Sequence, residues 1–139
     1  MKRNPLDVDF SKLVRLRSNY TCEHCGKRNV SAQGLDCSHL WGRKRRSVRW
    51  HPSNAAAHCM GCHAYLGANP ILFAAWIKKH LGDQHERIRD QAQAITHWKK
   101  ADLAEIRAQL KSELKRVQKM RDEGHEGRIE FSVPFVEDV

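Results

Sequence analysis

The most regular pattern of apolar and polar positions along this chain is helical, and it lies in the second half. From Ala101 to Glu123 apolar side chains recur at spacings of three and four residues, which predicts one long amphipathic helix. The stripe consists of Leu103, Ile106, Leu110, Leu114, Val117 and Met120. Two shorter helices are predicted before it, over Ile71–Leu81 with Asn69 as its cap, and over Asp83–Trp98. Two glycines end the helical half, and residues 128–135 are predicted to be extended.

The first half of the chain has shorter and less regular patterns. Apolar positions between Phe10 and Asn19 predict a short helix that Ser11 could cap. The residues from Gly34 to Leu40 are typical of a strand, and those from Ala55 to Leu66 are predicted to be helical.

These elements place the chain in the α+β class, with a small mixed core followed by a mainly helical half. The predicted boundaries are 1–68 for the core, 69–123 for the helical extension and 124–139 for an extended tail. The long helix has two interpretations. Its stripe could pack on the core, or it could form the seam of a homodimer through the C-terminal helices, although Glu113 falls where such a seam needs an apolar residue.

Charge adds information about the partner. Among the 139 residues Lys and Arg number 25 against 16 Asp and Glu, so the formal net charge is +9. This excess favours an anionic partner, nucleic acid first, over a merely well-solvated basic surface. No apolar run is long enough to cross a bilayer, and the basic start lacks the apolar stretch of a signal peptide. We therefore expect no membrane partner and a cytoplasmic location, where thiols stay reduced.

Two pairs of cysteines have the spacing of a metal site. Cys22 and Cys25, and likewise Cys59 and Cys62, are separated by two residues, which lets both sulfurs of each turn face one ion. The pattern predicts one structural Zn²⁺ per chain, closed to substrate; a redox dithiol is the alternative. The fifth cysteine, Cys37, is expected to be a buried, inert thiol.

A histidine that the zinc does not need follows the second cysteine pair. His63, with His39 on the predicted strand and Asn54 in the turn before residue 55, resembles the HNH endonuclease motif. The matching stretches are C22-E-H-C25, C37-S-H39, N54 and C59-M-G-C-H63, within residues 10–68. The resemblance implies a ββα-metal core in which two strands and a helix hold one divalent ion, Mg²⁺ or Mn²⁺, beside the structural zinc.

The resemblance also implies a function and roles for these residues. The chain would be an endonuclease that hydrolyses DNA phosphodiester bonds with little sequence specificity, in a bacterial or phage-infected cell. Branched recombination intermediates are a candidate substrate, as for some phage members of the family. His39 would be the general base and His63 a metal ligand, while Asn54 would orient His39 or join the metal shell.

One position departs from the family pattern. Ser38 stands where the family usually has an Asp or His ligand, so it would act from outside the metal's inner shell, and the ion would depend on His63 and Asn54. His51 is a second candidate ligand, although a solvated loop histidine is the simpler interpretation.

The densest positive stretch of the chain lies between His39 and Asn54. Its five basic residues, which we expect to contact phosphates, are Arg43, Lys44, Arg45, Arg46 and Arg49. Trp41 and Trp50 flank the stretch and are expected to pack rather than to stack on bases. Two other functions stay open at this stage: a non-catalytic zinc module that binds nucleic acid, and a protein-interaction adaptor that uses the long helices.

Overall fold

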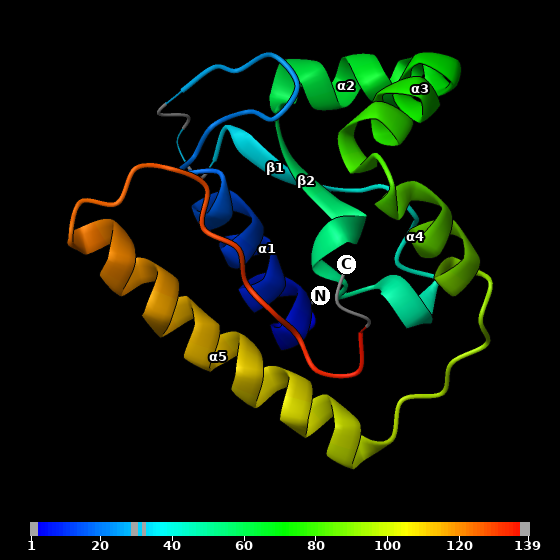
Figure 1. Cartoon of the computed structure of the whole chain (residues 1–139), viewed down its shortest axis with the longest axis vertical. Helices are drawn as coiled ribbons and strands as arrows, with labels where there is room; N and C mark the ends of the chain where they lie inside the picture. The colour runs from blue at the N-terminus through cyan, green and yellow to red at the C-terminus, as the bar shows by residue number, and fades with distance from the viewer. Residues whose placement is uncertain (1–2, 29–30, 32, 137–139) are drawn as a thin grey trace.

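The chain combines helices with one small antiparallel sheet, which confirms the α+β class (Figure 1). The computed structural model describes residues 3–28, 31 and 33–136, so residues 1–2, 29–30 and 32 of the predicted core and 137–139 of the predicted tail lie outside it. The elements, in chain order, are α1 (Pro5–Arg17), β1 (Leu35–His39), η1 (Arg46–Val48), η2 (Pro52–Asn54), β2 (Ala55–Cys59), α2 (Met60–Ala68), α3 (Pro70–Leu81), α4 (Gln84–Ala92) and α5 (Lys100–Asp122), where η marks a short 3-10 helix.

Helix α1 begins earlier than the sequence pattern predicts. Its cap is Asn4, whose Oδ1 accepts a hydrogen bond from Leu6 N at 2.9 Å, and Pro5 occupies the first helical position. The prediction that Ser11 caps the helix was wrong: Ser11 lies mid-helix, and its hydroxyl accepts from the Arg15 guanidinium.

Strand β2 is the main correction to the predicted elements. Residues 55–59 were predicted to begin a helix, but they pair antiparallel with β1 in the register Leu35↔Cys59 to His39↔Ala55, and α2 begins at Met60. Both faces of β2 are covered, and the alanines at 55, 56 and 57 are at most 1 % exposed. Their small side chains suit that position, so tertiary packing overrides the intrinsic helix preference of alanine.

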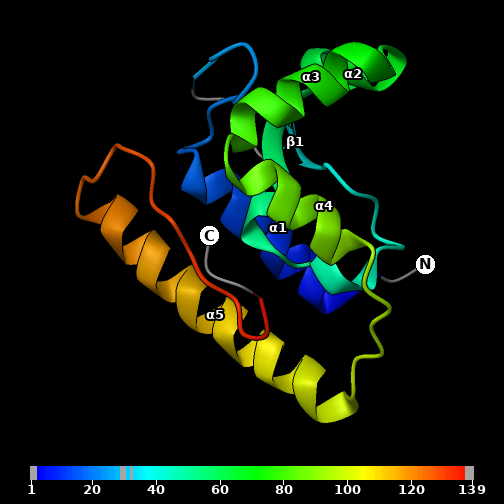
Figure 2. The same ribbon diagram turned by 45° about the vertical axis from the view of Figure 1, so that its right-hand side comes forward.

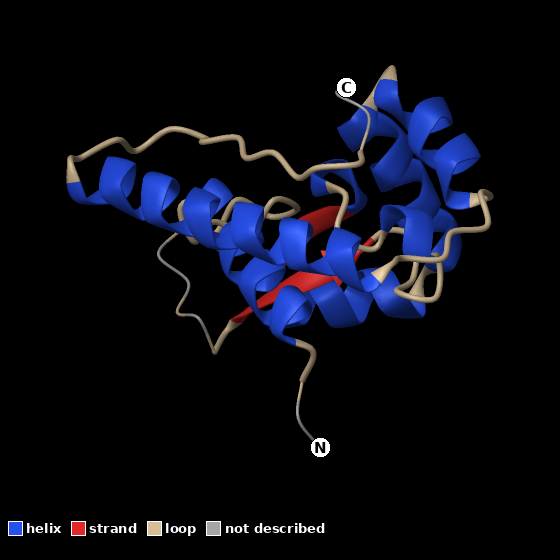
Figure 3. Ribbon diagram, turned by 90° about the horizontal axis from the view of Figure 1, so that it is seen from below, coloured by secondary structure: helices blue, strands red, loops and turns tan. Residues whose placement is uncertain are grey.

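The two faces of the sheet have different surroundings (Figure 3). Leu35, Cys37, Ala55 and Ala57 join the main hydrophobic core with α1, whereas the alternate positions point away from that core, as the period of a strand requires. The apolar stripe of α5 packs onto α1: Ile106, Leu110 and Val117 are buried there, and Leu103, Leu114 and Met120 are partly buried. Within the described chain the stripe therefore serves the core.

Helices α3 and α4 follow α2 on the side of the sheet away from α5 (Figure 1). The predicted helix at 71–81 is confirmed with one added residue, but the one predicted over 83–98 ends at Ala92. Beyond that point Ile95 is 89 % exposed, and Trp98 packs against Trp50 from a segment that is not helical. In the part of the chain that the structure describes, no helix is both long and apolar enough to span a bilayer.

The segment after α5 returns along the molecule between α1 and α5 (Figures 1 and 2). It is extended, as predicted, and its alternate residues Ile129, Phe131 and Val133 are each 6 % exposed. This segment also explains why the charged residue Glu113 can occupy the apolar stripe of α5. Its carboxylate accepts a hydrogen bond from Ser132 N at 2.9 Å and ion-pairs with Arg116. The three predicted segments thus contribute to one core.

The packing of this segment can be tested by comparing two phenylalanines within it. We expect Phe131→Ala to lower the free energy of unfolding by about 3 kcal/mol, because it empties a buried site against Phe10. Phe135→Ala, at a ring that is 50 % exposed, should cost less than about 1 kcal/mol. Urea unfolding followed by tryptophan fluorescence measures both. Equal losses would contradict the packing described.

Candidate functional site

The four predicted zinc ligands come together. The sulfur atoms of Cys22, Cys25, Cys59 and Cys62 all lie within 4.8 Å of one another, and the Sγ atoms of Cys25 and Cys59 are 3.9 Å apart. A tetrahedral zinc site with Zn–S distances of 2.3 Å has sulfur–sulfur edges of about 3.8 Å. The cluster therefore has the donor set and the size that Zn²⁺ requires.

Local backbone geometry aims the sulfurs at one point. In the first turn Gly26, at φ +78°, donates its N–H to Cys22 O at 2.9 Å, a conformation that favours glycine. In the second turn Cys59 ends β2 and caps α2, with its Sγ accepting from Cys62 N at 3.5 Å. His24 lies outside the cluster, with its Nδ1 3.2 Å from the Cys62 sulfur.

The electrostatics of the cluster call for a cation. Burial disfavours the Cys22 thiolate, but hydrogen bonds from the backbone N–H groups of Cys25, Cys59 and His24 lower the pKa of Cys22 to about 7. Burial and the neighbouring thiols raise the pKa of Cys62. Four thiols this close cannot all ionise without a positive charge between them, and a divalent ion supplies that charge.

The fifth cysteine is outside the cluster. Cys37 lies on β1 and packs against the core, and burial raises the pKa of its thiol to about 12. This agrees with the expectation of an inert thiol.

His39 ends β1 in a half-buried position. Its ring lies 5.9 Å from the Phe10 ring of α1, and its Nε2 is 3.3 Å from Arg49 O. A carbonyl can only accept, so Nε2 carries the proton and Nδ1 has the lone pair. Burial lowers the pKa of His39, an effect that the hydrogen bond to Arg49 partly opposes, so the imidazole is neutral at pH 7.

Asn54 fixes the long connection between the two strands. Its side chain is fully buried: Oδ1 accepts from Trp41 N at 2.8 Å, and Nδ2 donates to Trp41 O and Val48 O at 2.9 Å each. Its backbone carbonyl also accepts from Leu40 N, next to His39. The Asn54 amide is therefore engaged by the loop backbone at residues 41 and 48, and its catalytic role stays a prediction.

An ion pair places the carbonyl that His39 contacts. Arg49 donates from Nε and Nη2 to the two carboxylate oxygens of Asp7, at 3.1 and 2.5 Å, and the Trp50 indole N–H donates to Asp7 at 2.9 Å. Asp7 is 5 % exposed and lies at the start of α1. The position of the Arg49 carbonyl therefore depends on a contact between α1 and residues 49–50.

His63 lies in the first turn of α2, beside a carboxylate that the sequence pattern did not identify. Its Nδ1 is 2.9 Å from Asp36 Oδ2, and both side chains are about half exposed. This bond leaves Nε2 of His63 available as a ligand atom, with Asp36 orienting the ring, which is a frequent arrangement around metal-binding histidines. The alternation of a strand puts Asp36 on the same face as Ser38, and that alternation could have identified it.

The structure does not gather His39 and His63 into one cluster. Asp36 and His39 are three positions apart on β1, so they point to opposite faces and are separated by about 10 Å of strand. Within the described ranges, the four cysteines form the one group of three or more His, Cys, Asp or Glu side chains close enough to share an ion.

Two other predicted positions are buried. Ser38 is 1 % exposed and faces the same side as Asp36. His51 is also 1 % exposed, and its Nδ1 accepts from Ser53 N at 3.1 Å at the start of η2. The interpretation of His51 as a solvated loop histidine was therefore wrong, and its role here is to cap η2.

The basic stretch divides into an exposed part and a paired part. Its exposed residues are Arg43, Lys44, Arg45 and Arg46. The backbone beneath them is anchored, since Ser47 Oγ donates to Gln91 O at 2.6 Å and Trp98 Nε1 donates to Arg46 O at 3.0 Å. Arg49 is instead paired with Asp7, as above, and is 23 % exposed. Four of the five basic side chains are thus exposed on this loop, and one of them, Arg43, also ion-pairs with Asp7 at 3.6 Å while its side chain stays 60 % exposed.

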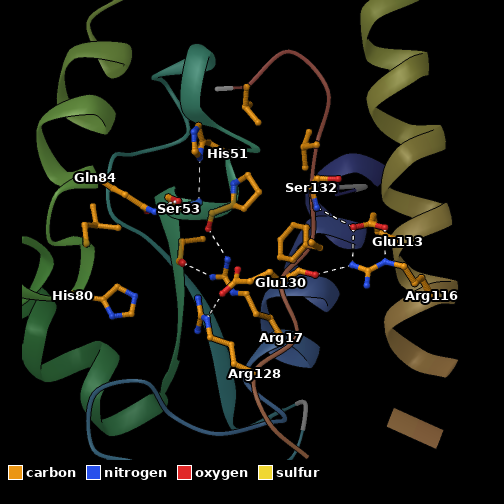
Figure 4. Close-up of a pocket in the computed structure, with 16 residues that line it drawn as sticks. Arg17, His51, Ser53, His80, Gln84, Glu113, Arg116, Arg128, Glu130 and Ser132 are labelled. Atoms are coloured by element: carbon orange, nitrogen blue, oxygen red, sulfur yellow. Dashed lines mark hydrogen bonds and ion pairs between the residues drawn. The ribbon is translucent and has the colours of Figure 1, made fainter. Parts of the chain in front are cut away.

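A separate cavity of about 820 Å³ lies beside β2, between η2, the α3–α4 turn, α5 and the C-terminal segment (Figure 4). Its charged groups bind one another. Arg116 pairs with Glu113, Arg128 pairs with Glu130, and buried Arg17 donates to the backbone carbonyls of Pro52 and Ala55 at 2.7 Å each. The cavity therefore lies where the C-terminal segment approaches strand β2, and hydrogen bonds and ion pairs among its own groups occupy its charged side chains.

Comparison of the chain with protein-family models, with curated proteins and with solved structures gave no match. The function proposed below rests on the geometry of the chain's own residues.

The zinc site can be tested with a matched pair of cysteine variants. We expect Cys59→Ala to abolish stoichiometric zinc and to lower the thermal midpoint, because metal binding at such a site contributes to folding. Cys37→Ala should keep about one zinc per chain. Mass spectrometry of the metal in purified protein measures both. Zinc retained in full by Cys59→Ala would contradict the assignment.

The Asp7 contact predicts a pH dependence of stability. Although burial alone would raise it, the pKa of Asp7 is held below its ordinary value by hydrogen bonds from Arg49 and Trp50. A lowered pKa in the folded state stabilises the protein above the ordinary value of about 4, and that contribution is lost as the pH falls further.

We therefore expect Asp7→Asn to be less stable than wild type at pH 7, with the difference shrinking at pH 3. Urea unfolding at both pH values measures it, and loss of zinc in acid affects both proteins alike. Asp9→Asn, on the same helix, is the control and should match wild type. A difference for Asp7→Asn that does not change with pH would refute the ion pair.

Proposed function

We propose that this chain is a metal-dependent endonuclease of the HNH type, which hydrolyses DNA phosphodiester bonds with little sequence specificity. The observation that carries the proposal is the setting of His39. A neutral imidazole ends β1 with Nε2 held by the Arg49 carbonyl, directly before a loop with four exposed cations. A base next to a phosphate-binding surface is what this hydrolysis needs.

The chain's own residues would divide the work as follows. His39 takes a proton from water through Nδ1, since Nε2 is committed to the carbonyl. Asn54 and the Asp7–Arg49 pair hold that carbonyl and the loop in place. The exposed cations of residues 43–46 contact the DNA backbone on either side of the bond, without reading bases.

A divalent ion would be held by His63, with Asp36 as the carboxylate beside it. Mg²⁺ and Mn²⁺ suit so few protein ligands, because Mg²⁺ in particular keeps several of its waters. When bound, the ion would supply positive charge to the phosphate and the leaving oxygen.

A second candidate function is a non-catalytic zinc module that binds nucleic acid. The observation that favours it is the placement of His39 and His63 on opposite faces of β1. In that case both histidines support structure alone, and the basic loop gives binding without cleavage.

Cleavage of supercoiled plasmid separates the two functions. We expect wild type to cut with Mg²⁺ or Mn²⁺ and not after chelation, and His39→Ala to lose about 10²–10⁴-fold in rate while still binding DNA. His97→Ala, at an exposed histidine away from the strand, is the matched control and should cut like wild type. A wild type that binds DNA but cuts with no ion, or a His39→Ala that cuts normally, would favour the binding module.

A further inference from the structure

We propose that the groove between α1 and α5 binds a single-stranded polynucleotide segment, as a second nucleic-acid surface apart from the loop of residues 43–46. The inference rests on the nucleic-acid binding in the function proposed above, and it does not need catalysis. The groove has a volume of about 620 Å³. It lies on the far side of α1 from His39: Phe10 contacts His39, whereas Lys12, two residues on and rotated by about 200°, lines the groove.

The groove has an apolar floor and a basic rim. Leu16, Tyr20 and Leu114 supply the apolar surface. The rim carries four cations, two from each helix: Lys12, Arg15, Lys115 and Lys119. An aromatic and apolar floor with cations along the edge is how proteins hold single strands, because bases stack on the floor while phosphates meet the rim.

The rim cations form no ion pairs within the fold. In the described ranges none of the four pairs with a carboxylate. Arg15 donates from Nη1 to Ser11 Oγ at 2.5 Å, and its Nε is buried without a hydrogen-bond partner. The one acid in the groove, Asp122, accepts from Gln118 Nε2 at 2.9 Å. By contrast Arg116 and Arg121, on the same helix, are bound to partners inside the molecule. Unpaired cations on both walls leave the groove attractive to a polyanion.

The rim on α5 continues beyond the groove with a regular spacing. Lys111, Lys115 and Lys119 are exposed and recur every four residues, so their Cα atoms repeat at about 6 Å along the helix axis. That repeat is comparable with the spacing of successive phosphates along an extended strand. A duplex is too wide for the site, since the axes of packed helices lie only about 8–10 Å apart.

Tyr20 is held at the end of the groove by strained backbone. Asn19 and Tyr20 both have positive φ, at 53° and 54°, which is uncommon for residues with side chains. The Tyr20 N–H donates to Arg15 O at 2.9 Å and fixes this turn after α1. Strain of this kind is concentrated at functional positions, and here it presents a half-buried aromatic ring beside Lys119 and Leu114.

Fluorescence anisotropy with a labelled oligothymidylate, without added divalent ion, tests the proposal. We expect Lys115→Gln/Lys119→Gln to weaken binding about tenfold and to reduce the slope of log affinity against log salt by about 1.4, for two phosphate contacts. Lys78→Gln/Lys79→Gln removes the same charge from exposed positions on α3 and should change affinity less than twofold. Tyr20→Leu should weaken binding about tenfold with an unchanged salt slope, because it removes stacking and no charge.

Folding of each variant is verified by its zinc content and thermal midpoint. Equal oligothymidylate binding by the two double-lysine variants would overturn the proposal. So would a loss of duplex affinity in Lys115→Gln/Lys119→Gln as large as its loss of oligothymidylate affinity. Displacement of the oligonucleotide by oligoglutamate, together with full binding by Tyr20→Leu, would show an acidic-peptide surface instead. A chain that never cuts plasmid but still shows the expected pattern would refute the endonuclease and leave the groove assignment standing.

Discussion

Four sulfur atoms drawn to one point are the constraint on which the rest of this structure depends. Cys59 is both the last residue of β2 and the cap of α2, so the cluster fixes the place where strand becomes helix. Because Cys22 and Cys25 lie just after α1, the same cluster holds the end of α1 next to that junction. The pairing of β1 with β2, and the position of His63 one residue beyond the cluster, follow from this clamp.

Buried charge supports the hairpin at two further points. Arg17 is 1 % exposed, and its guanidinium binds two backbone carbonyls of residues 52 and 55 while lying 5.2 Å from the centre of the Phe131 ring. It thus covers an edge of β2 that would otherwise present unpaired backbone groups. Asp7 performs the corresponding task at the other end of α1, where it holds residues 49 and 50. Both ends of one helix therefore determine where the loop between the strands lies.

Features that depend on the spacing of residues along the chain could be predicted from the sequence. The cysteine pairs, β1, α3, α5 and the extended C-terminal segment could be predicted because each has its own local pattern. Local patterns did not predict β2, because its three alanines favour a helix and become a strand only through pairing with β1. The same holds for Asp36 beside His63 and for Asp7 with Arg49, which are contacts between positions 27 and 42 residues apart. The roles of His39, Asn54 and His63 in catalysis stay predictions, and the structure adds which groups each of them contacts.

The order of synthesis separates formation of the zinc site from the covering of helix α1. All four sulfurs have been synthesised by residue 62, so the metal clamp can close while more than half of the chain is still to be added. The apolar cover of α1, in contrast, comes from Ile106 onward and is completed by Phe131 and Val133 near the end. On the ribosome the nascent protein would therefore carry a closed zinc site with α1 still uncovered. Premature termination before residue 106 would leave that apolar helix exposed to chaperones and proteases, whereas termination between residues 122 and 129 would leave it covered by α5 alone.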